Sequence, residues 1–304
     1  MRARILGSAA GGGFPQWNCG CPNCTAARSS SPDVDARTQD SVLVTTDDGS
    51  AAYLLNASPD VAAQIARTRE LHPRGLRHTP IAAVVLTNAD LDHCLGLLSL
   101  RESQPYAVYA TREVEAHLRE RNAIFRTLER ARHAVTWRTL ELDRPVDLPL
   151  PDGRASGIEL TAFAAPGKLP KHLEGVARPS RGDNVGLLVR HGDVTLAYAS
   201  AVASLDGFAE RARGATCLLF DGTFYSSDEL ARLGIDGPRA EDMAHLPVGG
   251  KHGSLSGLDG LSVGRRIYTH VNNTNPMLMR RSTEHDAVRR AGWEIAFDGM
   301  ELLP

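Results

Sequence analysis

Short apolar segments separated by turns recur along the chain and predict a protein rich in β-strands. Ile81–Leu86 and Cys217–Phe220 are uninterrupted apolar runs, which is typical of strands buried on both faces. Further strands are expected at residues 2–6, 41–46, 52–55, 106–110, 158–164, 185–189, 194–198 and 266–269. Helices are expected at residues 61–69, 95–101, 113–121 and 284–291.

This order of elements predicts two mixed β-sheets packed face to face with helices outside them, an α/β fold of the αββα sandwich type. We expect a single domain over residues 1–304, because no linker divides the two halves. The proline-rich stretch Pro145–Pro151 is interpreted as a joint between strands of similar kind. Ser58 is expected to cap the helix at 61–69, with Pro59 in its first turn.

Composition places the chain among ordinary globular proteins. Apolar residues make up 42% and charged residues 23%, which excludes a disordered or fibrous protein. Lys and Arg number 34 against 36 for Asp and Glu, a balance that argues against nucleic-acid binding. No apolar run approaches the roughly 20 residues of a membrane-spanning helix, and no signal-peptide pattern is visible. We therefore expect a cytoplasmic protein with no membrane partner.

A loop at residues 17–24 holds three of the five cysteines, in the spacing C-x-C-x₂-C. Cys19, Cys21 and Cys24 are close enough to converge on one structural zinc ion. Disulfides explain the cluster poorly, since three cysteines leave one unpaired and the cytosol keeps thiols reduced. The fourth ligand must come from elsewhere, as a histidine or as an Asn or Asp oxygen, and Asn273 is one candidate.

A second group of candidate ligands follows the buried strand at 81–86. Asp90, Asp92 and His93 lie in a polar loop that leads into a helix. Adjacent residues on a regular helix point about 100° apart, so Asp92 and His93 can share a metal only if the loop turns both inward. Acidic residues are also attracted to helix N-termini for electrostatic reasons, and this segment alone leaves both interpretations open.

Two later strands end in residues of the same chemistry. His270 follows the strand at 266–269, in a loop with several asparagines that could orient a ligand histidine or simply form a turn. Asp221 ends the strand at 217–220, and His245 lies in a separate segment. Asp221 and His245 are candidates for proton transfer or for supporting a metal ligand, although each alone could also be structural.

Taken in order, these segments resemble the metallo-β-lactamase superfamily and, within it, the B proteins of pyrroloquinoline quinone (PQQ) biosynthesis. The resemblance covers nearly the whole chain. It rests on residues 6–13 with the cysteine loop, and on residues 54–60, 72–78, 86–93 with 96–98, 166–168, 219–223, 243–245 and 270–276. The superfamily implies an αββα sandwich, in agreement with the strand pattern.

The same resemblance exposes a departure in the metal ligands. Hydrolases of the superfamily carry H-x-H-x-D-H after a strand and bind two metal ions. Here those positions are Asn88, Asp90, Asp92 and His93, so the first two histidines are missing. Residues 196–201, where a bridging aspartate is expected, contain no carboxylate. Half of the ligands of a two-metal hydrolase are therefore absent.

The remaining set, Asp92, His93 and His270, is two histidines and one carboxylate, the ligand set of non-haem Fe(II) oxygenases. The resemblance implies iron- and O₂-dependent hydroxylation of the tyrosine ring in a small Glu-Tyr precursor cut from a peptide. Asp90, Asp221 and His245 would then shape the site or move protons. Alternatives are a metal-dependent phosphodiesterase or other hydrolase, and a carrier that helps transport PQQ or its precursor to the periplasm. A homodimer is left open.

Overall fold

Two β-sheets form the centre of the computed structural model, which describes residues 1–130 and 135–303. Within these residues the first sheet has six strands, in the order β1 (Arg2–Gly7), β2 (Ser41–Thr45), β3 (Ala52–Leu55), β4 (Ile81–Val85), β5 (Ala107–Ala110) and β6 (Thr136–Thr139). The second sheet has seven, in the order β13 (Glu294–Ile295), β12 (Arg265–Thr269), β11 (Cys217–Asp221), β10 (Val194–Ala199), β9 (Val185–His191), β8 (Ala155–Ala164) and β7 (Pro145–Pro149). Both sheets mix parallel and antiparallel pairs, as predicted.

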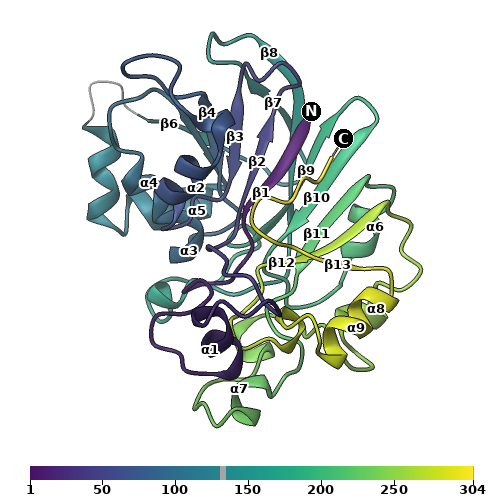
Figure 1. Ribbon diagram of the computed structural model, residues 1–304. Coiled ribbons are helices and arrows are strands. Elements are labelled where there is room, and N and C mark those ends of the chain that lie inside the picture. The colour runs from purple at the N-terminus through teal and green to yellow at the C-terminus, as the bar shows by residue number, and fades with distance from the viewer. Residues whose placement is uncertain (131–134, 304) are drawn as a thin grey trace.

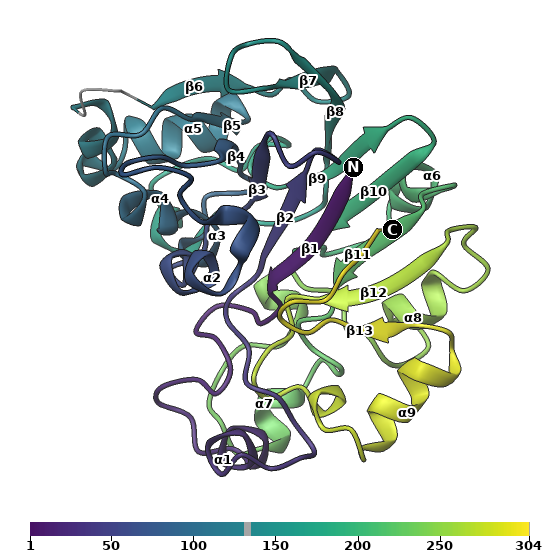
Figure 2. The same ribbon diagram turned by 45° about the horizontal axis from the view of Figure 1, so that its top comes forward.

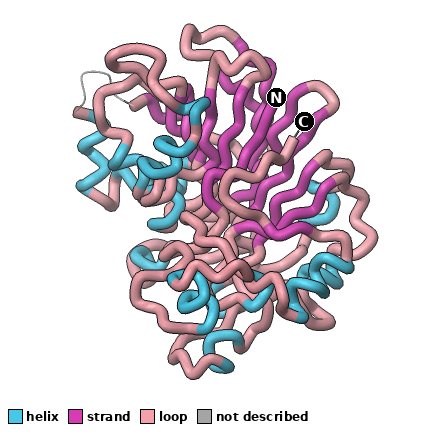
Figure 3. The backbone as a smooth tube through the Cα atoms, viewed as in Figure 1, coloured by secondary structure: helices cyan, strands magenta, loops and turns pink. Residues whose placement is uncertain are grey.

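Helices lie outside both sheets (Figures 1 and 3). The first sheet is accompanied by α2 (Val61–Arg67), α3 (Leu91–Cys94), α4 (Gly96–Ser99) and α5 (Arg112–Arg119). The second is accompanied by α6 (Phe208–Ala212), α8 (Ser254–Gly257) and α9 (Thr283–Arg290). At the lower end of Figure 1 lie α1 (Pro22–Arg28) and α7 (Glu229–Arg232). Short 3₁₀ helices cover Arg69–Leu71, Ala123–Glu129, Lys171–Leu173, Glu241–Met243 and Pro276–Leu278.

The central strands are buried on both faces, which explains their uninterrupted apolar sequences. On β4, Val85 belongs to the core between the sheets, whereas Val84 packs under the helices of the first sheet. On β10, Tyr198 faces the core between the sheets and Ala197 faces the helices of the second. Successive side chains point to opposite faces, so three apolar layers form from one alternating pattern. This arrangement confirms the predicted αββα sandwich.

The end of the described chain runs along β1. The Ile5 N–H donates to the Met300 carbonyl at 2.9 Å, and the Leu302 N–H donates to the Ala3 carbonyl at 2.8 Å. Figure 2 shows the two termini side by side at this edge. The first and last segments are therefore held together by backbone hydrogen bonds.

Edge strands depart from the prediction. Residues 145–149 form β7, not a joint, and β6 and β13 were not predicted at all. β7 tolerates Pro145 and Pro149 because it is the last strand of its sheet, where a residue without an N–H leaves no neighbour unpaired. The helix expected at 95–101 is two single turns, α3 and α4, the first of which begins at Leu91.

The start predicted for α2 was also wrong. The helix begins at Val61, and its capping position is Asp60. The Ser58 hydroxyl instead accepts from the Asp60 N–H at 3.2 Å, one step before the helix. The backbone of Ala57 is already bonded to the turn between α3 and α4, because its carbonyl accepts from the Gly96 N–H at 2.9 Å. That pairing holds Ala57 outside the helix.

No helix among the described residues combines the length and apolar character needed to cross a membrane.

Candidate metal centre

Strand ends in the two sheets bring the candidate ligands to one edge of the sandwich. Asp92 and His93 lie in α3, which follows β4. Asp221 is the last residue of β11, and His270 is the first residue after β12. β11 and β12 are parallel, so their carboxyl ends lie together. Figure 1 shows α3 below the first sheet, at the end where such sites are commonly built.

Asp92, His93 and His270 form a compact triad. The His270 Nε2 lies 3.0 Å from Asp92 Oδ2, and the His93 Nε2 lies 3.8 Å from the same oxygen. All three ligand atoms lie within 4.8 Å of one another, close enough for one metal ion. The single turn of α3 places Asp92 and His93 so that both side chains turn inward. The structure thus brings together the three residues predicted from the sequence.

A hydrogen bond to the Nδ1 of His93 leaves its Nε2 free to bind a metal ion. The His93 Nδ1 lies 2.7 Å from the Asn88 side-chain oxygen, which can only accept a hydrogen bond. Nδ1 therefore carries the proton, and Nε2 carries a lone pair. Within residues 1–130 and 135–303 this buried Nε2 has no hydrogen-bond partner. A buried polar atom without a partner is costly, and a metal ion would satisfy it.

Thr223 orients His270 in the same way. Its hydroxyl lies 2.7 Å from Asp221 Oδ1 and 2.8 Å from His270 Nδ1. Because the carboxylate must accept, the hydroxyl donates to Asp221 and accepts from His270 Nδ1–H. The His270 Nε2 is then left facing Asp92. The backbone of His270 has a left-handed φ of 54°, and its neighbour Val271 is fixed by a 2.9 Å hydrogen bond to the Ser8 carbonyl.

Electrostatics favour a cation between these three side chains. Burial acts to raise the pKa of Asp92, but His93 and His270 together lower it below its usual value. Burial acts to lower the pKa of His270, but Asp92 raises it to about 9. Burial lowers the pKa of His93 to about 4. At neutral pH the site therefore holds a carboxylate, a neutral imidazole and an imidazolium, whose proton a divalent metal would replace.

Asp90 lies beside the triad. Its Oδ2 accepts a 2.9 Å hydrogen bond from the Asn88 amide, and the same amide reaches Asn184 Oδ1 at 3.3 Å. Burial and then the neighbouring Asp92 raise the pKa of Asp90 to about 7. Asn88 and Asp90, which stand where the superfamily has two histidines, are therefore engaged with each other, and Asp90 can exchange a proton near neutral pH.

Asp221 and His245 form a second pair next to the triad. The His245 Nδ1 lies 2.7 Å from Asp221 Oδ2, and the His245 ring stacks on the His270 ring at 5.6 Å between centroids. Asp221 also accepts from the Val202 N–H, the Thr223 N–H and the Thr223 hydroxyl. Although Asp221, His245 and His270 are close enough to hold a metal, four hydrogen bonds already occupy the Asp221 carboxylate. This geometry favours an orienting role for Asp221.

A polar network under the site was missed by the sequence analysis. The buried Asp40 accepts a 2.6 Å hydrogen bond from the Thr269 hydroxyl and another from the Tyr198 hydroxyl. The Tyr198 oxygen accepts from the Asn56 amide at 2.9 Å, and Asn56 Oδ1 accepts from the Thr87 N–H at 2.9 Å. Burial raises the pKa of Asp40 to about 6. Single polar residues inside apolar stretches, such as Tyr198, were the available signal.

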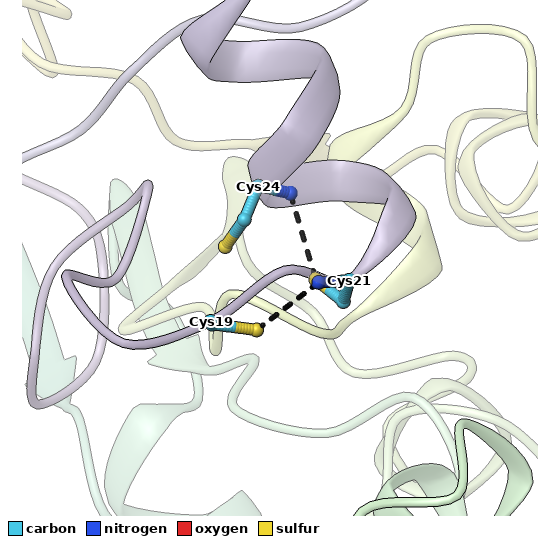
Figure 4. A group of neighbouring side chains, drawn as sticks. All are labelled: Cys19, Cys21 and Cys24. Carbon is cyan, nitrogen blue, oxygen red and sulfur yellow. Dashed lines mark hydrogen bonds between the residues drawn. The ribbon is translucent and has the colours of Figure 1, made fainter.

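The three cysteines converge at the start of α1 (Figure 4). The Cys21 N–H lies 3.4 Å from Cys19 Sγ, and the Cys24 N–H lies 3.5 Å from Cys21 Sγ. These contacts turn the sulfur atoms toward one another, within 4.8 Å. Burial raises the pKa of Cys21 to about 12, an effect that a bound cation would reverse because it stabilises the thiolate.

Asn273 lies against this cluster, as the sequence suggested. Its amide nitrogen is 3.4 Å from Cys24 Sγ, and a 180° rotation of the amide would present Oδ1 to the sulfur atoms instead. The Asn23 side chain donates to the backbone carbonyls of Asn273 and Asn275 at 3.1 and 2.9 Å. The cysteine loop is thus fastened to the segment that begins with His270. A role for Asn273 as fourth ligand stays a prediction.

Comparisons with known proteins agree with this architecture. A family model described as a beta-lactamase superfamily domain matches residues 52–271. The coenzyme PQQ synthesis protein B of Methylobacterium radiotolerans is 43% identical, over 99% of this chain and 99% of that protein. A crystal structure of Zn²⁺-bound PqqB from Methylobacterium extorquens is 40% identical and covers 100% of both chains, with a TM-score of 0.93.

A diphosphatase of the PhnP family, 22% identical with a TM-score of 0.66 over 100% of this chain and 97% of that one, shares the fold. The chain belongs to the beta-lactamase superfamily and, within it, to the family of coenzyme PQQ synthesis protein B. Both levels of the resemblance stated from the sequence are confirmed.

Proposed function

We propose that this protein acts in PQQ biosynthesis as an iron- and O₂-dependent hydroxylase of the tyrosine ring in a Glu-Tyr peptide-derived precursor. The observation that carries the proposal is the triad of Asp92, His93 and His270, in which hydrogen bonds direct both histidine Nε2 atoms toward one carboxylate. Two histidines and one carboxylate leave coordination positions open, as in non-haem iron oxygenases. The family relationship supports the pathway.

In this proposal Asp92, His93 and His270 hold Fe(II), which supplies the activation of O₂. Inserting one oxygen atom into a ring C–H bond and reducing the other to water consumes two electrons and two protons, so an external reductant such as ascorbate is required. Asp90 can hold or release a proton near neutral pH. Asp221 fixes the Nδ1 side of His245, which leaves the other ring nitrogen available for proton transfer.

We assign the three-cysteine loop a structural zinc, held by Cys19, Cys21 and Cys24 with Asn273 as fourth ligand. Three thiolates and one oxygen close the coordination shell, which suits a structural rather than a catalytic ion. The crystallised relative from Methylobacterium extorquens binds Zn²⁺, which supports zinc chemistry in the family.

The hydroxylase proposal is tested by oxygen incorporation. Protein loaded with Fe(II), ascorbate and the Glu-Tyr precursor is expected to add one ¹⁸O atom from ¹⁸O₂, detected by mass spectrometry. His93→Ala removes a ligand and should lower both bound iron and product by more than about 100-fold, beyond the cost of losing an outer hydrogen bond. His78→Ala, which changes an exposed histidine, is the matched control.

Full oxygenation by His93→Ala would refute the site. Two bound ions beside the loop zinc, with hydrolysis of a phosphodiester, would support the hydrolase alternative. Tight binding of PQQ without oxygen incorporation would support a carrier.

A further inference from the structure

A cavity of about 590 Å³ lies between the cysteine loop and α7. Its apolar wall consists of Phe224, Leu230, Leu233, Ile235 and Met243. Figures 1 and 2 show α1, which follows the cysteine loop, next to α7. Cavities of this volume are typical of sites for small organic ligands.

Polar residues also line the cavity. They are Gln16, Asn18, Asn272, Asn273 and Thr274, beside residues 19–21 of the cysteine loop. Amides both donate and accept hydrogen bonds, so they can bind hydroxyl or carbonyl groups in either protonation state. A cavity lined by both apolar side chains and amide-bearing residues suits a flat ring that carries oxygen substituents.

Two lining residues connect the cavity to the candidate metal centre. Gly11 lies so close to Asp92 that a Cβ added to it would be 3.3 Å from Asp92 Oδ2. Phe224 packs edge-on against the His245 ring, with 6.1 Å between the centroids. The cavity therefore reaches the residues that touch both the triad and the Asp221–His245 pair.

A larger cavity of about 940 Å³ shares the lining residues Pro22 and Thr274 with the first one. Several charged side chains line it, including Glu229, Arg239 and Lys251. Neither Gly11 nor Phe224 contributes to it. Of the two cavities, only the smaller one is lined by the residues that contact Asp92 and His245.

We infer that the cavity between the cysteine loop and α7 binds the phenol or quinone ring of the substrate, and that the cysteine loop forms one wall of this ring site. The inference rests on the proposed function only for the identity of the substrate as tyrosine-derived. The loop then has a second role besides holding zinc, because it contacts the ligand directly.

The ring site is tested by filling it from either wall. Gly20 lines the cavity and a Cβ added to it meets no atom within 4 Å, so Gly20→Phe adds a ring at the loop side of the cavity without a backbone clash. Ile235→Trp fills it from the α7 side. Gly75→Phe is the matched control, because a Cβ at Gly75 also meets no atom within 4 Å and Gly75 lies outside the cavity.

Binding of the dipeptide Glu-Tyr to iron-free protein is measured by calorimetry, with zinc content checked for each variant. We expect Gly20→Phe and Ile235→Trp to weaken binding at least tenfold, and Gly75→Phe to bind within twofold of the unchanged protein. The unchanged protein should bind Glu-Tyr more tightly than a dipeptide of glutamate and cyclohexylalanine, which lacks the hydroxyl and the aromatic ring.

Unaltered binding by both filled variants, or no preference for the aromatic dipeptide, would overturn the inference. Neither result depends on iron or O₂, so the ring site and the hydroxylase activity can fail separately.

Discussion

At the scale of single residues, the site is defined by hydrogen bonds that fix which histidine nitrogen is free. Asn88 and Thr223 bind the Nδ1 atoms of His93 and His270, and both Nε2 atoms then point toward Asp92. Two polar residues that are not themselves ligands therefore decide whether the ligands face a metal. Their effect should be measurable without changing any ligand.

Thr223→Val tests this arrangement. The variant removes the hydroxyl that accepts from His270 Nδ1–H, so we expect iron affinity to fall about 10- to 100-fold, as for outer partners of other metal sites. Thr223→Ser retains a hydroxyl and should stay within a few-fold of the unchanged protein. Titration with Fe(II) under anaerobic conditions measures both. Equal iron affinity of the valine and serine variants would contradict the role given to Thr223.

Glu229 predicts a pH dependence of stability. Burial raises the pKa of this carboxyl from 4.5 to about 7, so the folded state keeps a proton that the unfolded state releases. The contribution of Glu229 to stability should therefore fall as the pH rises from about 4.5 to 7 and change little above that, by about 3 kcal/mol in total.

Urea unfolding at pH 5, 6, 7 and 8 measures this decline. Glu229→Gln cannot titrate, so its stability should change less over the same range. A stability that rises from pH 5 to 7 only in the unchanged protein would contradict the assignment.

At the scale of elements, the pattern of apolar residues predicted the central strands, which are buried on both faces, but did not predict the edge strands. β4 and β11 were recognisable as apolar runs. β7 was not, because its prolines are tolerated only through its edge position, which the local sequence does not reveal. The start of α2 was misplaced because a tertiary contact, from Gly96 to Ala57, competes with the local capping signal.

In the candidate site, too, the residues in local motifs were predicted and those linked by long-range contacts were not. Asp92, His93 and His270 were identified because each follows an apolar strand in a motif of the superfamily. Asp40 was missed, since its partner Tyr198 is 158 positions away and no local pattern joins them. Groups that act through long-range hydrogen bonds become visible only when the strands are placed side by side.

The cysteine loop is an element whose stability should depend on its ion. Cys21→Ser removes one sulfur ligand, so we expect loss of zinc and a fall in the melting midpoint of at least about 5 °C. Cys94→Ser, which changes a buried cysteine after β4, should retain zinc. Metal analysis and thermal unfolding measure the two effects, and zinc retained by Cys21→Ser would exclude the site.

At the scale of the whole molecule, a hydrogen-bonded chain joins the two sheets below the site. Asp40 precedes β2 and Asn56 follows β3 in the first sheet, while Tyr198 and Thr269 belong to strands of the second. The polar chain crosses an otherwise apolar core, so its members have no water to replace a lost partner.

Tyr198→Phe leaves the Asn56 amide and the Asp40 carboxylate each without one partner. We expect the free energy of unfolding to fall by about 1–3 kcal/mol, the cost of leaving buried polar groups unsatisfied. Tyr225 is a half-buried tyrosine outside this hydrogen-bonded network, so Tyr225→Phe should change the free energy of unfolding by less than about 0.5 kcal/mol. Denaturant unfolding gives both values, and equal values for the two variants would argue against a role in joining the sheets.

The Asn23 side chain, which donates to the carbonyls of Asn273 and Asn275, ties the cysteine loop to the segment that starts at His270. If zinc occupies the cysteine loop and iron occupies the triad, each ion that orders this shared segment also strengthens binding of the other ion. Linkage then makes the benefit reciprocal: the factor by which zinc strengthens iron binding must equal the factor by which iron strengthens zinc binding. Loss of one metal ion from a purified sample would therefore weaken the binding of the other by the same factor.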